Sequence, residues 1–106
     1  MLELAVEVIE DVPTIRVNGE VGLLEVADFR DRLREVARGG HQTVVIDGSR
    51  VRHMYSEGLG AMVELALILK ERGGKLILRD PSRLLTGLIN AATLGQVLTI
   101  EHTEPE

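Results

Sequence analysis

The chain has 106 residues, no cysteine and a formal net charge of −5, which describes a single domain that folds without disulfides or a thiolate metal site. Acidic and basic residues are interleaved, and only one tyrosine and one phenylalanine are present, so we expect no nucleic-acid partner, which would require a cationic surface and stacking rings. No apolar run is long enough to enter and span a membrane, and the first residues lack the pattern of a signal peptide. We therefore expect a cytoplasmic protein.

The first segments of the chain are predicted to form a β-hairpin. Residues 2–9 alternate between apolar side chains and polar or small ones, which is the period of a strand with one buried face. Turn-forming residues follow at 10–13, and the alternation resumes at 14–18, so the two strands should pair. Residues 18–22 are typical of a loop because they contain an asparagine and two glycines.

The middle of the chain predicts two helices that flank a buried strand. From Val26 to Ala37 the apolar residues recur at helical spacing, and a glycine pair ends the segment. Three consecutive apolar residues at 44–46 favour a central strand covered on both faces. A second helix is expected from about Glu57 to Arg72, and it is apolar around most of its circumference, so it should lie deep against the sheet.

The last third of the chain repeats the strand–helix alternation. A strand is predicted at 76–78, a third helix is expected to begin at Asp80 and Pro81, and a short strand follows at 97–100. The predicted order is β-β-α-β-α-β-α-β, an α/β fold with a mixed, largely parallel sheet of four or five strands and helices packed on it. We expect one domain over 1–101 and a mobile tail over 102–106.

The segment from Asp47 to Gly60 connects the central strand to the second helix. In open α/β sheets, ligands and partners usually bind where such strands end. Ser56 stands at the predicted helix start, where its hydroxyl could accept a hydrogen bond from a free backbone N–H as an N-cap. The same N–H groups would also receive a phosphate carried by Ser56. Both interpretations remain open from the residues alone.

The neighbours of Ser56 also allow more than one interpretation. Tyr55, the only tyrosine, is either a partner anchor or a ring folded onto the edge of the core. Glu57 is better explained as an acid that favours the helix dipole than as a built-in phosphate mimic. We expect Met54 in the core and His53 half-buried.

Catalytic and nucleotide-binding interpretations of this segment are weak. Gly58 and Gly60 are not followed by the third glycine of a dinucleotide fingerprint or by the lysine of a P-loop. Ser56, His53 and Asp47 could be imagined as a triad, but no third group is spaced to orient the histidine. We therefore expect no catalytic residue, no metal site and no cofactor, and not an enzyme.

At these residues the chain resembles the STAS domain family, shared by sulfate transporters and anti-sigma factor antagonists. The family pattern is an aspartate that ends a strand, seven mostly apolar or small residues, and then Asp-Ser-Ser-Gly-Leu-Gly at a helix start. Here Asp47 ends the predicted strand, and residues 55–60, Tyr-Ser-Glu-Gly-Leu-Gly, occupy the second motif without a gap. The resemblance continues through 71–78 and reaches Pro81 and Leu94, so it covers nearly the whole chain.

This resemblance implies a partner switch. In such antagonists the first serine of the second motif is phosphorylated by an anti-sigma factor that is itself a kinase, and that position here is Ser56. The unphosphorylated protein would bind the anti-sigma factor and free the sigma factor, phosphorylation would break this complex, and a phosphatase would restore it. The resemblance places the partner-binding surface at Arg52, His53, Tyr55, Ser56, Glu57 and Gly58, with Met62 if exposed, and at the loops 19–24 and 50–53.

A second interpretation stays open because Tyr55 replaces the aspartate of the second motif and Glu57 replaces its second serine. The chain would then be a STAS subunit that docks on a transporter ATPase or a signalling scaffold and is never phosphorylated. Either interpretation describes a protein-binding regulator that acts as a monomer or weak homodimer.

Overall fold

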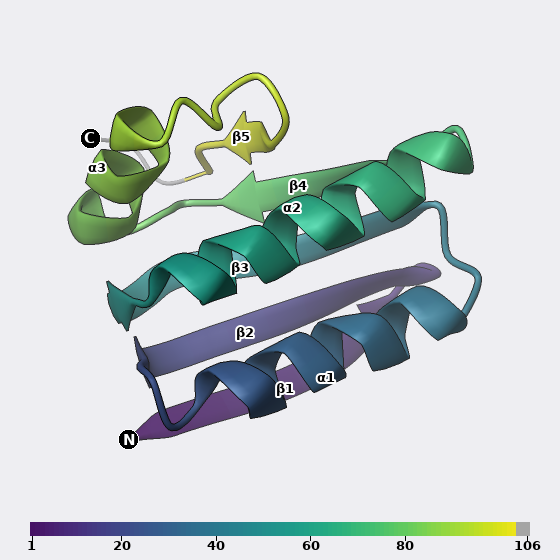
Figure 1. Cartoon of the computed structure of the whole chain (residues 1–106). Coiled ribbons are helices and arrows are strands. Elements are labelled where there is room, and N and C mark those ends of the chain that lie inside the picture. The colour runs from purple at the N-terminus through teal and green to yellow at the C-terminus, as the bar shows by residue number, and fades with distance from the viewer. Residues whose placement is uncertain (104–106) are drawn as a thin grey trace.

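The computed structural model describes residues 1–103, in which five strands form one sheet and three helices pack on it (Figure 1). The elements follow the predicted order. The strands are β1 (Leu2–Ile9), β2 (Val12–Val21), β3 (Thr43–Met54), β4 (Lys75–Arg79) and β5 (Thr99–Glu101), and the helices are α1 (Val26–Arg38), α2 (Ser56–Glu71) and α3 (Arg83–Ala91). No helix within residues 1–103 is long and apolar enough to cross a membrane.

The sheet has the strand order β1-β2-β3-β4-β5, with β1 antiparallel to β2 and every other neighbouring pair parallel. The mixed, largely parallel sheet predicted from the sequence is therefore confirmed, as is the amino-terminal hairpin. Glu10 and Asp11 make the hairpin turn, and both have positive φ angles, of 50° and 68°. Aspartate, with its short polar side chain, is enriched in this left-handed region, and a two-residue turn with both φ angles positive matches the twist of a hairpin.

The helices cover one face of the sheet. In Figure 1, α1 and α2 lie side by side in front of the strands, and α3 lies beyond the carboxyl end of β4. The core between sheet and helices contains Ile15, Phe29 and Ile46, all at most 1% exposed. Val45 points to the opposite face, where Thr14 and Ile77 flank it across the sheet, and it is nevertheless only 3% exposed. The central strand is therefore buried on both faces over residues 44–46, as expected, although the three described helices lie on only one of them.

Strands β2 and β3 are longer than predicted. The expected loops 18–22 and 50–53 lie largely within these strands, which pair with each other as far as Val21 and Met54. Two register shifts in the pairing, with Gly19 at a φ of +110°, accommodate the loop-like residues. Asp47 consequently lies inside β3 and does not end it.

The third helix and the end of the chain also differ from expectation. Ser82, not Asp80, is the N-cap of α3: its hydroxyl accepts a hydrogen bond from Leu85 N at 3.2 Å and donates one to Val51 O at 2.7 Å. Asp80 instead accepts a hydrogen bond from Thr103 N at 2.7 Å. Of the tail predicted to be mobile, residues 104–106 lie outside the described residues.

Candidate functional site

Helix α2 begins with Ser56, which is exposed and lies at the carboxyl end of the central strand. The N-cap is Tyr55, with φ −65° and ψ 148°, and its carbonyl accepts the amides of Gly58 at 2.8 Å and Leu59 at 3.4 Å. No side chain of residues 1–103 caps the helix, so the N-cap interpretation of Ser56 was wrong by one position. Within the same residues the exposed Ser56 hydroxyl makes no hydrogen bond.

The start of α2 is held against the ends of β2 and β3. Tyr55 N donates a hydrogen bond to Val21 O at 2.7 Å. Gly58 is buried, and a Cβ atom added there would lie 2.4 Å from the sulfur of Met54 and 3.3 Å from Cγ1 of Val21. The absence of a side chain at Gly58 thus allows the first turn of α2 to approach the strand ends closely, which fixes where Ser56 emerges.

A matched pair of alanine substitutions tests this approach. Gly60 has nothing within 4 Å of its added Cβ, so Gly60→Ala should raise the free energy of unfolding by about 0.5–1 kcal/mol through helix propensity alone. Gly58→Ala should lose this gain and lower the free energy of unfolding, because its Cβ meets the buried Met54 side chain. Urea unfolding of both variants measures the difference, and equal stabilisation would show that the first turn is not tightly packed.

Two exposed leucines lie at the same end of the sheet as this helix start. Leu23 and Leu24 are 67% and 87% exposed in the connection from β2 to α1. Since β2 and β3 are neighbouring parallel strands, this connection and the start of α2 both follow the carboxyl ends of their strands, at the same end of the sheet. We call Leu23, Leu24, Tyr55, Ser56 and Glu57 the switch surface. The sequence signal for the leucines was weak: two adjacent apolar residues inside a predicted loop, outside the helical spacing.

The remaining residues of the predicted partner surface fall into an exposed group and a buried group. Arg52 and His53 are exposed near the end of β3, and His53 pairs across the sheet with Glu20. His53 is thus more exposed than expected, whereas Met54 lies in the core as predicted. Gly58 and Met62 are buried, so neither contributes a side chain to the surface.

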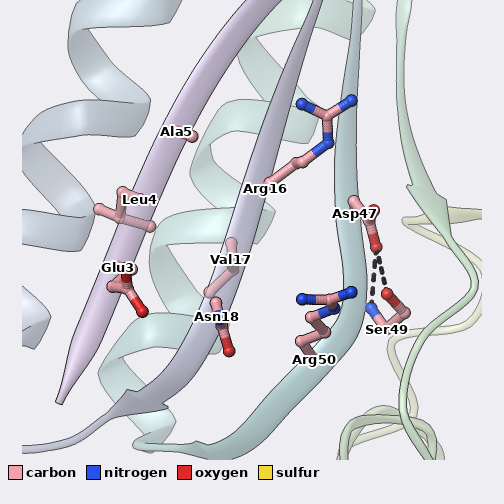
Figure 2. A pocket seen from close by; sticks show the side chains of 9 residues that line it. All are labelled: Glu3, Leu4, Ala5, Arg16, Val17, Asn18, Asp47, Ser49 and Arg50. Atoms are coloured by element: carbon pink, nitrogen blue, oxygen red, sulfur yellow. Dashed lines mark hydrogen bonds between the residues drawn. The ribbon is translucent and has the colours of Figure 1, made fainter.

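Asp47 lies on the helix-free face of the sheet, away from the layer that contains α2. It lines a cavity of about 490 Å³ over β1, β2 and β3 (Figure 2). Its Oδ1 atom accepts hydrogen bonds from Ser49 N at 3.0 Å and Ser49 Oγ at 2.7 Å. Within residues 1–103, no hydrogen bond joins Asp47, His53 and Ser56. The two halves of the motif, Asp47 and 55–60, are therefore not brought together into one site.

The charges around this cavity are largely balanced. Arg16 and Arg50 lie among Glu3 and Asp47, and Arg16 Nη1 is 2.7 Å from Oε2 of Glu7. Figure 2 shows Arg16, Asp47 and Arg50 on the face turned away from the helices. Such a lining does not favour one sign of ligand charge. Within residues 1–103, no group of three histidine, aspartate or glutamate side chains is placed to hold a metal ion.

A two-point ion pair links α2 to α1 beyond the site. Arg34 Nε and Nη2 each lie 3.1 Å from one carboxylate oxygen of Glu64. The hydrogen bonds from Arg34 lower the pKa of the Glu64 carboxyl, and the same contact raises the pKa of the Arg34 guanidinium. Since both side chains are substantially exposed, the pair fixes the relative position of the two helices more than it stabilises the fold.

Comparison with known proteins supports the fold and assigns a family. A family model described as "Mlab, STAS domain" matches residues 4–100. The anti-sigma factor antagonist SpoIIAA in its unphosphorylated form superposes with a TM-score of 0.78 at 23% identity, over 98% of this chain and 90% of that one. An anti-sigma factor antagonist from Mycobacterium paratuberculosis superposes with a TM-score of 0.86 at 19% identity, over 95% and 86%.

The phosphorylated form of SpoIIAA, a Bacillus cell fate determinant, also matches, with a TM-score of 0.73 at 24% identity over 98% of this chain and 93% of that one. At these identities the superpositions establish a shared fold. Because the family model extends from the first strand almost to the end of the last, and the sheet and helices follow the same order as in these structures, the chain belongs to the STAS domain family.

Proposed function

We propose that this chain is an anti-sigma factor antagonist that binds a kinase-type anti-sigma factor and is switched by phosphorylation of Ser56. The observation that carries the proposal is the exposed hydroxyl of Ser56, unpartnered within residues 1–103, at the first residue of α2. The proposal is supported by the likeness to antagonist structures and by the position of Ser56 in the family motif.

The start of α2 suits both the hydroxyl and its phosphate. In the transfer, the γ-phosphoryl group of ATP would pass to Oγ of Ser56, ADP would leave, and a base of the kinase would take the hydroxyl proton. The amides of Ser56 and Glu57 belong to the first turn of α2, where N–H groups lack partners inside the helix, so they can donate to an anion. The modification therefore requires no unfolding of α2.

Glu57 opposes the phosphate only weakly. A phosphoserine carries about −1.5 to −2 charges near neutral pH. At a separation of about 6 Å, its repulsion from the Glu57 carboxylate costs about 1 kcal/mol in a water-like dielectric. The positive end of the helix dipole offsets about 0.3–1 kcal/mol of this cost. The two effects nearly cancel, so the carboxylate after Ser56 is compatible with phosphorylation.

The switch surface has the composition of a binding site whose centre is apolar. Leu23 and Leu24 supply exposed apolar area, and half-buried Tyr55 adds an aromatic side chain with a polar tip. Ser56 lies at the same end of the sheet as these side chains. A partner that covers the leucines would exclude water from the serine, and a phosphate there would lose its hydration without gaining a matching cation. This explains how one modification could release the partner.

The direct test is a kinase reaction. The protein is incubated with the kinase-type anti-sigma factor of its host and ATP, and its intact mass is measured. We expect one added phosphate on the native chain and none on Ser56→Ala. Ser49→Ala is the matched control, because Ser49 is also an exposed serine but its hydroxyl is bound to Asp47, and it should still accept one phosphate. Phosphate on Ser56→Ala, or neither phosphate nor complex with the native chain, would contradict the proposal.

The replacement of the motif aspartate by Tyr55 favours a second candidate function, a STAS subunit that docks constitutively on a transporter ATPase or signalling scaffold. This candidate uses the same apolar surface but gives Ser56 no reactive role. It predicts that the native chain forms a stable complex with such a partner in the absence of ATP and gains no phosphate. A pull-down with native protein and with Ser56→Asp separates the two, because only a switched antagonist should lose its partner.

A further inference from the structure

The outer side of β1 is an uncovered sheet edge. Within residues 1–103, β1 pairs only with β2, so one side of its eight-residue backbone offers free N–H and C=O groups. Its apolar side chains are also accessible: Val6 is 39% exposed, Val8 56% and Ile9 47%. A long apolar edge is a template for pairing with another strand, and proteins usually shorten, charge or cover such edges.

The apolar surface continues from the strand to the neighbouring helix. Val6 and Val8 line a cavity of about 250 Å³ between β1 and α1, whose other lining residues include apolar Pro13 and Val36 and polar Arg32, Glu35 and His41. The even-numbered apolar side chains of β1 lie on the helix side of the sheet, because they alternate with residues 3, 5 and 7 along the strand. They are Leu2, Leu4, Val6 and Val8. A strand added at this edge with the same alternation would extend the apolar layer under α1.

We propose that β1 pairs antiparallel with β1 of a second copy, about a two-fold axis at Val6, and joins the two sheets into one. A two-fold axis requires each contact to be reciprocal. In this register Val6 lies opposite Val6 of the second copy, Leu4 opposite Val8, and Ala5 opposite Glu7. Residues 3–9 of each copy are paired, and the apolar side chains of both strands remain on the helix side.

Charge selects this register over its neighbours. An axis at Ala5 would set Glu3 directly opposite Glu7 at two places, and an axis at Glu7 would set Glu7 opposite itself. Like charges in directly opposed positions destabilise a strand pair. An axis at Leu4 avoids such contacts but pairs only residues 2–6 and leaves Val8 uncovered. The axis at Val6 gives the longer pairing with no carboxylate opposite another.

The remaining like-charge contacts are diagonal, between the two copies of Glu7 and between Glu3 of each copy and Glu7 of the other, so every one of them involves a Glu7. Each Glu7 is already neutralised by its own Arg16, whose Nη1 lies 2.7 Å from the carboxylate, so the diagonal repulsion is small. A single strand pair buries less surface than a standard stable interface, so we expect a reversible dimer that dissociates on dilution.

Cysteine cross-linking tests the position of the axis. The chain has no cysteine of its own, so a disulfide can form only at the introduced position. Directly opposed Cβ atoms in an antiparallel pair are about 4.5–5.5 Å apart, near the reach of a disulfide. Val6→Cys should therefore give about tenfold more disulfide-linked dimer than Val8→Cys under the same mild oxidation. Val8→Cys is the matched control because Val8 is more exposed than Val6 but lies opposite Leu4.

Random collision would produce the opposite ranking, since the more exposed thiol would react faster. Equal or greater cross-linking of Val8→Cys would therefore overturn the register.

A charge-swap experiment tests the interface without a covalent bond. Val6→Lys and Val6→Glu should each sediment as monomers at concentrations where the native chain self-associates, and an equimolar mixture should recover the dimer. A native chain that remains monomeric at all accessible concentrations, or a mixture that does not recover, would refute the dimer. Circular dichroism confirms that each variant is folded.

Discussion

Ser56→Asp is expected to lower the affinity for a kinase-type anti-sigma factor by about 100-fold or more. An unpaired charge or like-charge contact in a closed interface costs several kcal/mol, and each 1.4 kcal/mol changes the dissociation constant about tenfold. The added carboxylate would stand beside Glu57, at the end of the sheet where Leu23 and Leu24 are exposed. Titration calorimetry with the purified partner measures the effect.

Two matched variants separate charge from shape at this position. Ser56→Ala removes the hydroxyl without adding charge and should bind within a few-fold of the native chain. Glu57→Gln removes the neighbouring carboxylate. Combined with Ser56→Asp in one chain, it should recover part of the affinity that Ser56→Asp alone loses, since less repulsion remains. If Ser56→Asp bound as tightly as the native chain, the switch would be excluded and constitutive docking would be the better explanation.

Phe29→Ala should lower the free energy of unfolding by about 3–5 kcal/mol, the usual cost of deleting a buried phenylalanine. Phe29 is the only phenylalanine, is the fourth residue of α1 and is fully buried between this helix and the sheet. Typical domains are stable by only about 5–15 kcal/mol, so this loss would bring the chain close to unfolding. Urea denaturation, with the midpoint and slope fitted separately, provides the measurement.

Leu24→Ala is the control, since it also shortens an apolar side chain but at a site that is 87% exposed. It should change the free energy of unfolding by no more than about 0.5 kcal/mol. If Leu24 belongs to the partner surface, the same variant should still lose affinity for the partner. A loss below about 1 kcal/mol for Phe29→Ala would show that α1 does not contribute to the core as described.

The type and order of the elements could be predicted because their signals are local. The apolar spacing from Val26 predicted a helix to Ala37, and α1 runs from Val26 to Arg38. Alternation predicted the first two strands and their hairpin in the same way. These patterns depend on which side of a single element faces the core, and the residues of that element are enough to show it.

The arrangement of the layers could not be predicted from these patterns. Because strands β2, β3, β4 and β5 follow one another across the sheet in chain order, their right-handed connections bring the helices to the same face. The strand order was unknown from the sequence, so the face on which each helix lies was not predicted. For the same reason, Asp47 was grouped with the residues before α2, although it points to the helix-free face.

By itself the sequence determined the class of fold, the family resemblance and the position of Ser56 within one residue of the helix start. Only the tertiary structure decided that Tyr55 is the N-cap of α2, that Gly58 is buried in its first turn, and that β1 pairs with no strand except β2 within residues 1–103. The physical reason is that helix and strand periods are carried by neighbouring residues, whereas exposure and strand pairing depend on segments that meet only after the chain has folded.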